Sequence, residues 1–318
     1  MKEPLVTMLI PYHDTSPYLV KTLISLKNLQ YRNIEFVFVA DRASHYSRIQ
    51  VDNFLKDKIG VNLSSENPGI VAALNLGLRN SHGTFVARLD NDDCVFPDRL
   101  QHQVRYFNQN SKLVVVGSNI RLINDAGREI GLKKFPEKHK QIMSYLKFAN
   151  PFAHSSTMFR NPLLIDEQLT YVDDFPYAED YFFWKNLLKF GEGYNIQTPL
   201  TQYRVHETQI STQQSSIALL SSTKISIINC AQDNPENTVN VADCSDIESL
   251  RSLKNFNGLQ KSIVFLSIFR EKQLGISWEG LRIISSAFWS HPKPFFFFCK
   301  LKLQKFVNFL TYKKYPHG

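Results

Sequence analysis

The first 120 residues alternate short apolar runs with helical patterns, and this alternation restricts the chain to few folds. Several runs are apolar at every position, which is typical of parallel strands covered on both faces. The runs lie at Val6–Ile10, Ile34–Ala40, Val61–Leu63, Phe85–Leu89 and Leu113–Val116. Helical patterns follow the pairs Ser16-Pro17 and Pro68-Gly69 and the residue Pro97. Strands that alternate with helices predict an α/β fold with a mainly parallel sheet and right-handed crossovers.

The length of the chain allows a large core and a second, smaller part. With 318 residues, 43% of them hydrophobic, the chain is expected to form one large domain and an appendage. We place the sheet domain at residues 1–212. After Thr212 the polar run STQQSS and two further helical patterns predict a helical appendage over residues 213–318.

Several classes of protein are excluded by composition and motif. The apolar run near the N-terminus is interrupted by Pro11 and is too short for a signal peptide, so no export is expected. Cys94, Cys230, Cys244 and Cys299 form no CxxC pair, which favours reduced thiols over disulfides or a zinc site. No glycine-rich dinucleotide or P-loop motif follows a strand.

The basic residues are concentrated at the C-terminus. The net charge is +8, and the segment 291–318 carries six lysines and no acidic residue. As a helix it would have a broad apolar face, but its lysines are too central for a membrane span. We expect this tail to bind an anionic membrane surface, which predicts a cytoplasmic, peripheral protein. A terminal helix packed on the first domain is the alternative. A nucleic-acid partner is not expected, because the rest of the chain is nearly neutral.

Three carboxylates follow the fourth apolar run, in the stretch ARLDNDDCVFPDRL, residues 87–100. Asp90, Asp92 and Asp93 lie within four positions of one another. Like charges this close raise one another's pKa, which costs stability unless a cation or a ligand offsets it. Arg88 precedes them in an apolar run. It either pairs with one of the acids or with a phosphate, or occupies a solvated edge.

Four interpretations of this acidic cluster differ in their chemistry. An Asp-rich turn needs no ligand, because Asp side chains satisfy their own backbone. An EF-hand loop is excluded, since Val95 and Gln101 stand where it requires Gly and Glu. A phosphotransferase of the haloacid-dehalogenase type uses a strand-end Asp pair, but its motif has Thr or Val in place of Cys94. A divalent cation held by carboxylates and by the diphosphate of a nucleotide sugar fits the cluster best.

An ordered series of motifs resembles the large family of inverting glycosyltransferases with the GT-A fold, family 2. The motifs are TMLIPYHD, FVFVADRAS, NPGIVAALNLGLRNSHGTFVARLDNDDCVFPDRL, NPFAHSSTMF, YAEDYFFWKNLLKFG and LTQYRVHETQIS. They cover residues 5 to about 212. Within that family, the sequence is similar to bacterial lipooligosaccharide and capsule sugar transferases, particularly those that add N-acetylglucosamine to a terminal galactose. The resemblance implies a GT-A catalytic domain.

The resemblance assigns one group of residues to the nucleotide sugar. It places Pro11 and Tyr12 beside the nucleotide. It also places Asp41 against the uracil, although one acid stands here where the family usually has two. Asn75 lies on a helix where the family has a polar residue near the nucleotide or the sugar. A helix-surface asparagine is the alternative for Asn75.

The resemblance also implies a metal site that uses the acidic cluster. Asp90 and Asp92 correspond to the DxD motif of the family, with Asp90 near the ribose or the metal and Asp92 on the metal. Asp93 is a further candidate for the nucleotide sugar or the metal. His206 matches a metal or diphosphate ligand, and a neutral imidazole suits Mn²⁺; a structural role is its alternative. The expected cofactor is Mn²⁺ or Mg²⁺.

A second acidic pair is assigned to the acceptor side. Asp180, the second acid of the ED pair, matches the catalytic base of the family, because inversion by single displacement needs one carboxylate to accept a proton. The two acids could instead stabilise the first turn of a helix predicted over Tyr181–Phe190. Glu179, His154 and Arg204 are assigned to acceptor binding or to positioning, and Arg204 could face phosphate. A hydrogen-bonded core histidine is the alternative for His154.

The predicted function is a metal-dependent inverting transfer of GlcNAc, GalNAc, Gal or Glc from a UDP-sugar to a glycan hydroxyl. The acceptor implied by the resemblance is a lipooligosaccharide, lipopolysaccharide or capsule glycan, lipid-linked, with a β-1,3 linkage to the new sugar. One alternative is a catalytically idle member that binds nucleotide sugar or serves as a scaffold. The presence of Asp90, Asp92 and Asp180 together argues against it. The phosphotransferase is the less favoured alternative.

Overall fold

The computed structural model describes residues 3–13, 17–147 and 149–206, together with a few residues between 217 and 229. They belong almost wholly to the first of two units into which the chain divides, residues 1–218. The predicted appendage, with its basic tail, lies outside the described residues apart from those few positions, so its start at residue 213 stays a prediction. Among the described residues, none of the helices has both the length and the hydrophobicity that a membrane span requires.

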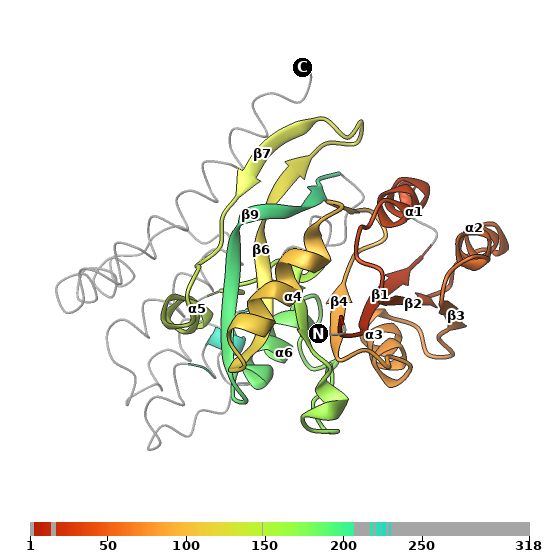
Figure 1. Cartoon of the computed structure of the whole chain (residues 1–318). Coiled ribbons are helices and arrows are strands. Elements are labelled where there is room, and N and C mark those ends of the chain that lie inside the picture. Colours follow the sequence, from red (N-terminus) through yellow and green to blue (C-terminus); the bar gives the residue numbers. More distant parts are fainter. Residues whose placement is uncertain are drawn as a thin grey trace, which may run out of the picture. The chain divides into compact units, whose positions relative to one another are not determined.

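Strands and helices alternate in the N-terminal half, as predicted. The elements are β1 (Val6–Tyr12), α1 (Leu19–Lys27), β2 (Ile34–Ala40), α2 (His45–Leu55), β3 (Gly60–Ser64), α3 (Ile70–Arg79) and β4 (Phe85–Arg88). The four strands are parallel and lie in the order β3-β2-β1-β4 (Figure 1). The predicted α/β class is therefore confirmed. Helix α2 was not predicted, because its polar sequence HYSRIQVDNFL has only a narrow apolar stripe.

The second half of the described chain extends this sheet with strands of both directions. Its elements are β5 (Cys94–Val95), α4 (Arg99–Gln109), β6 (Leu113–Ile123), β7 (Glu129–Lys133), α5 (His139–Leu146), β8 (Met158–Arg160), α6 (Glu179–Leu187) and β9 (Glu192–Arg204), with short 3₁₀ turns at His154–Ser156 and Pro162–Leu164. The sheet continues in the order β4-β8-β6-β9-β5, and β7 pairs with β6. Strand β8 is antiparallel to both of its neighbours, whereas β6 and β9 are parallel.

The core lies on both faces of the parallel strands, which explains why these strands are apolar at consecutive positions. On one face, Phe36 and Phe38 of β2 contact Phe54 of α2, with ring centroids 5.0 and 5.6 Å from that of Phe54. On the other face, α3 approaches β1 so closely that a Cβ atom on Gly77 would lie 2.1 Å from a methyl group of Leu9. Helices α1 and α2 lie on one side of strands β1–β3, and α3 lies on the other (Figure 1).

The topology brings two distant segments to one edge of the sheet. The carboxyl ends of β1, β2 and β4 are neighbours because these strands are parallel. The acidic segment 90–93 follows β4 directly, and β5 then pairs antiparallel with the end of β9, Cys94 with Gln202 and Val95 with Thr201. This pairing sets Arg204 and His206 beside the acidic segment, at the edge where ligands bind in open α/β sheets.

Candidate active site

The three acidic residues after β4 converge on one point. Asp90, Asp92 and Asp93 each offer a carboxylate oxygen, and these oxygens lie within 4.8 Å of one another. Asp93 is fully buried, whereas Asp90 and Asp92 are half-buried. The backbone N–H of Asp90 donates a hydrogen bond of 2.9 Å to the Ser155 hydroxyl, and that hydroxyl donates back to the Asp90 carboxylate. Such a set of oxygen donors is the kind that Mg²⁺ and Mn²⁺ prefer.

Arg88 is a buried counterion of this cluster. Its side chain is 2% exposed, and its guanidinium forms an ion pair with the Asp90 carboxylate. Burial acts to lower the pKa of Arg88, but the charges of Asp90 and Asp93 raise it above its ordinary value. The solvated edge position is therefore wrong, and pairing with an acid is the correct alternative. Burial is possible here because the ion pair compensates the charge.

Asp93 has the most unusual environment of the three acids. Burial raises its pKa well above the ordinary value, and the charges of Asp92 and Asp90 raise it further. Its Oδ1 accepts a hydrogen bond of 2.8 Å from the Arg204 backbone N–H. Its Oδ2 has no hydrogen-bond partner in the described part of the chain. A buried carboxylate oxygen without a partner is costly, and a cation would satisfy it.

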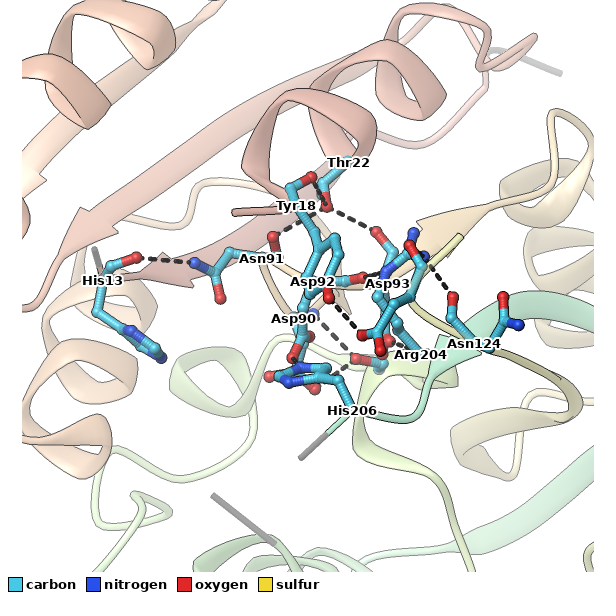
Figure 2. Close-up of polar contacts among 12 residues, drawn as sticks. His13, Tyr18, Thr22, Asp90, Asn91, Asp92, Asp93, Asn124, Arg204 and His206 are labelled. Carbon is cyan, nitrogen blue, oxygen red and sulfur yellow. Dashed lines mark hydrogen bonds and ion pairs between the residues drawn. The ribbon is translucent and has the colours of Figure 1, made fainter. Parts of the chain in front are cut away.

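Two basic side chains at and just after the end of β9, Arg204 and His206, lie beside Asp92 (Figure 2). Arg204 is buried, and its Nε donates to the Asp92 carbonyl at 2.9 Å. His206 Nε2 lies 3.0 Å from Asp92 Oδ2, so two of the three predicted metal ligands are in direct contact. The structure thus places Arg204 beside the acidic segment 90–93, with its guanidinium bonded to the backbone carbonyl of Asp92. Its predicted role on the acceptor side stays a prediction.

Glu179 and Asp180 form the first turn of α6. Asp180 Oδ2 accepts from the Asn150 side-chain amide at 2.7 Å, and Oδ1 accepts from the Tyr181 backbone N–H at 2.7 Å. Burial raises the pKa of Asp180 to about 6. Burial, and then the charge of Asp180, raise the pKa of Glu179 to about 7. The helix begins two residues before the predicted start, so its dipole also favours both acids. A base with a raised pKa is well suited to accept protons near neutral pH.

A hydrogen-bonded chain joins two further predicted residues. Asn75 on α3 bonds both backbone groups of Tyr171, at 2.9 and 3.0 Å. The Tyr171 hydroxyl lies 3.0 Å from His154 Nε2. Burial and the nearby charge of Arg88 lower the pKa of His154 well below its ordinary value, which favours a neutral ring. Asn75 therefore fixes the segment before α6, and His154 is hydrogen-bonded as in its core alternative.

The predicted nucleotide residues lie at the ends of β1 and β2. Pro11 and Tyr12 are buried within β1, which extends two residues beyond the predicted strand, and the Tyr12 hydroxyl donates to Asn62 at 2.8 Å. Asp41 follows β2 and accepts from the Gly69 backbone N–H, 3.1 Å from each oxygen. Asp41 thus holds the N-terminus of α3, where Gly69 has a φ of 109°.

Backbone strain marks both predicted sides of the site. Two non-glycine residues of the described chain have positive φ, Arg42 at 52° and Tyr177 at 60°. Arg42 follows Asp41 directly, and Tyr177 lies two residues before Glu179. Residues held in this conformation cluster at functional sites in proteins, because the surrounding structure must compensate the strain.

Sequence reasoning missed several residues that shape the site. Arg88 is not one of them, since a basic residue in the apolar run FVAR already indicated a residue that is either paired or exposed. The missed residues are Tyr171, Asn150 and Ser155, which had no signal, because each acts through a contact between segments distant in the sequence. Tyr18 was missed as well; its ring contacts His206 and Arg204.

Comparisons with known proteins relate the chain to one family and to one fold. Residues 7–165, half of the chain, match the family model described as glycosyl transferase family 2. The O-antigen biosynthesis glycosyltransferase WbnJ of Escherichia coli is 30% identical over 226 residues, which cover 67% of this chain and 84% of WbnJ.

Solved structures with the same fold include two complexes. S. aureus TarS, residues 1–349, in complex with UDP-GlcNAc has a TM-score of 0.56 at 15% identity, over 85% of this chain and 81% of that one. The mannosyltransferase PcManGT of Pyrobaculum calidifontis, in complex with GDP-Man and Mn²⁺, has a TM-score of 0.55 at 14% identity, over 100% of this chain and 89% of that one. At this identity the likeness concerns the fold.

Proposed function

The chain belongs to glycosyl transferase family 2, and from this premise we propose that it moves a sugar from a UDP-sugar to a hydroxyl of a bacterial surface glycan, with inversion at the anomeric carbon. The observation that carries the proposal is that one buried arginine, Arg88, interacts electrostatically with both groups of acidic residues, the cluster at 90–93 and the pair at the start of α6. Arg88 is bonded to Asp90, and its charge also acts on Asp180. The acids proposed to bind the donor and the proposed base, Asp180, therefore both interact with the same positive charge.

The acidic cluster fits a divalent cation. Three carboxylate oxygens converge there, and Asp93 keeps a buried oxygen without a hydrogen-bond partner among the described residues. We propose that Asp90 and Asp92 hold Mn²⁺ or Mg²⁺, with His206 as a nitrogen ligand, and that Asp93 supports them from behind. The bound ion would neutralise the charge that builds up on the leaving diphosphate. The Mn²⁺ named in the PcManGT complex supports this choice.

Asp180 is proposed as the single base of the reaction. Its carboxylate accepts the proton of the acceptor hydroxyl while that oxygen bonds to the anomeric carbon. The bond from the anomeric carbon to the diphosphate oxygen breaks on the opposite side, and UDP leaves. Asn150 and the Tyr181 N–H each occupy one direction on the carboxylate, which fixes its orientation. A carboxylate has further lone pairs that can accept the proton.

The donor and the acceptor are proposed by chemical class. The UDP-GlcNAc complex of TarS supports a UDP-sugar, with GlcNAc, GalNAc, Gal or Glc as the sugar. Pro11, Tyr12 and Asp41 would surround the nucleotide, and Asn75 would shape its sugar side. The O-antigen role of WbnJ supports a lipopolysaccharide or related glycan as the acceptor, and a β-1,3 linkage is proposed. Glu179 and His154 would contact or position this acceptor.

The donor proposal is tested by calorimetric titration of the protein with UDP and with GDP. We expect UDP to bind, Mn²⁺ to strengthen the binding, and EDTA to remove that increase. GDP should bind more weakly, because Asp41 would contact the uracil. Equal or tighter binding of GDP would overturn the choice of donor.

The basic tail is proposed to hold the enzyme at the cytoplasmic face of the membrane, near a lipid-linked acceptor. The six lysines of residues 291–318 motivate this proposal. Deleting the residues after His291 should release the protein from anionic liposomes in a sedimentation assay. Unchanged sedimentation of the shortened protein would contradict it.

The raised pKa of the two α6 acids predicts a pH dependence. A base works only when it is deprotonated, so kcat should fall as the pH decreases through about 6 to 7, where Asp180 and Glu179 gain protons. Stability should change in the opposite direction. The folded protein holds these protons more tightly than the unfolded chain, so the stability that they contribute is lost as the pH rises from the ordinary pKa values of 3.8 and 4.5 through the folded values of about 6 and about 7. Activity and thermal melting, followed from about pH 3.5 to 8.5, measure both. If kcat instead fell only as the pH decreased through about 4, the assignment of a base with a raised pKa would be contradicted.

A further inference from the structure

Tyr18 contacts both Arg204 and His206, the two basic residues beside Asp92. Its ring lies 4.4 Å from the Arg204 guanidinium carbon and 5.2 Å from the His206 ring, measured to the ring centroid. Figure 2 shows the tyrosine above Asp92, beside Arg204 and His206. The three residues come from the segment after β1 and from the end of β9, almost two hundred positions apart. Tyr18 therefore connects the segment after β1 with the end of β9.

The hydroxyl of Tyr18 ties in a third segment, the turn between β6 and β7. It donates a hydrogen bond to the Asp125 carboxylate, and Lys21 donates to the Asp125 carbonyl at 3.2 Å. Arg204 donates to the carbonyls of Asn124 and Asp125 from the same direction, at 2.9 and 3.3 Å. Burial and the Asp125 hydrogen bond raise the pKa of Tyr18 to about 12, so the phenol stays protonated and donates.

We propose that Tyr18 is a positioning residue for the divalent cation, because its ring fixes the orientation of His206 and Arg204 toward Asp92. This inference rests on the proposed metal-dependent binding of a UDP-sugar. Both neighbours act on the same acid: His206 meets its carboxylate, and Arg204 binds its carbonyl. A ring in contact with an imidazole and a guanidinium limits the rotamers available to both. Without it, the two side chains lose that restraint.

The aromatic ring, rather than the hydroxyl, should carry this effect. Tyr18→Phe keeps the ring and removes the hydrogen bond to Asp125, which lies at an exposed position. Tyr18→Leu removes the ring and keeps an apolar side chain. The affinity for UDP in the presence of Mn²⁺ should fall roughly five- to thirtyfold in Tyr18→Leu, the range expected for the loss of one partly buried cation–π contact. It should change by about threefold or less in Tyr18→Phe.

The experiment compares calorimetric titrations of wild type and variants with UDP, in Mn²⁺ and in EDTA. We expect Tyr18→Leu to lose affinity in Mn²⁺ only, and its affinity in EDTA to equal that of the wild type. Tyr106→Leu is the matched control. It removes another tyrosine that contacts a second ring, in this case Tyr194 at the opposite end of β9, roughly 33 Å along the strand from Arg204. The control should bind as the wild type does in both solutions.

Two outcomes would overturn the inference about Tyr18 without affecting the proposed function. Tyr18→Leu could bind UDP with Mn²⁺ as tightly as the wild type, or it could lose equal affinity in Mn²⁺ and in EDTA, which would assign the ring to the nucleotide or to the fold. A different result would contradict the proposed function instead. In that case the wild type itself would show no strengthening of UDP binding by Mn²⁺. A melting curve of each variant identifies loss of folding separately.

Discussion

Replacing Asp180 with asparagine should leave UDP binding unchanged and reduce kcat by on the order of a hundredfold or more. The amide has nearly the shape of the carboxylate, and its oxygen can still accept one of the two hydrogen bonds, from Asn150 or from the Tyr181 N–H, but it cannot take up the proton of the acceptor. In the described part of the chain, the hydrogen bonds of the Asp180 carboxylate connect it to Asn150 and Tyr181 and not to the acidic cluster. The measurement combines steady-state kinetics with calorimetric titration of UDP and Mn²⁺.

Glu167→Gln is the matched control for Asp180→Asn. Glu167 is an exposed acid in the segment before α6, and the substitution makes the same change from carboxylate to amide. It should leave kcat and UDP binding at wild-type values. If Asp180→Asn turned over at a rate within a few-fold of its control, Asp180 would not be the base, and Glu179 would become the candidate.

Replacing Arg88 with methionine should produce the largest loss of stability. Arg88 is the buried cation beside Asp90, so its removal leaves buried negative charge uncompensated. Breaking a buried ion pair in this way costs about 3–5 kcal/mol. The lower end of the range applies here, because the Asp90 side chain is 36% exposed and water screens part of its charge. Urea denaturation at pH 7 measures the change in the free energy of unfolding.

Two further variants separate the charge of Arg88 from its shape. Arg88→Lys restores a cation but not the planar guanidinium, so it should recover part of the lost stability. Arg79→Met removes an exposed arginine at the end of α3 and should change the free energy of unfolding by less than about 0.5 kcal/mol. An Arg88→Met protein as stable as Arg79→Met would show that the ion pair is not needed for folding.

The fold could be predicted from the sequence where local patterns decide the structure. Buried parallel strands such as β1 and β2 are continuously apolar, and the helices α1, α3 and α4 each begin within two residues of a proline signal. The patterns fail for β9, whose sequence EGYNIQTPLTQYR mixes polar and apolar residues because only part of it faces the core. They also fail for the narrow apolar stripe of α2. In both, packing against distant segments overrides local preference.

The candidate site divides in a similar way. Asp90, Asp92 and Asp93 are adjacent in the sequence, so their convergence follows from a single turn. His206 meets Asp92 only because β5 pairs with β9, a contact across more than a hundred positions that no local pattern encodes. Asn75 gave no local sign that it fixes the backbone of Tyr171. Arg88 shows that a charged residue in an apolar run can indicate an ion pair, here with Asp90.

The most direct test of the proposed function is the release of UDP from a panel of UDP-sugars. The assay compares Mn²⁺, Mg²⁺ and EDTA, each with and without a galactose-terminated acceptor. We expect one donor to release UDP, the acceptor to increase the rate, and EDTA to abolish it. Release from a donor that persists in EDTA would contradict the metal-dependent site at Asp90, Asp92 and His206. Binding of UDP without turnover of any donor would contradict the transferase and favour an idle nucleotide-sugar binder.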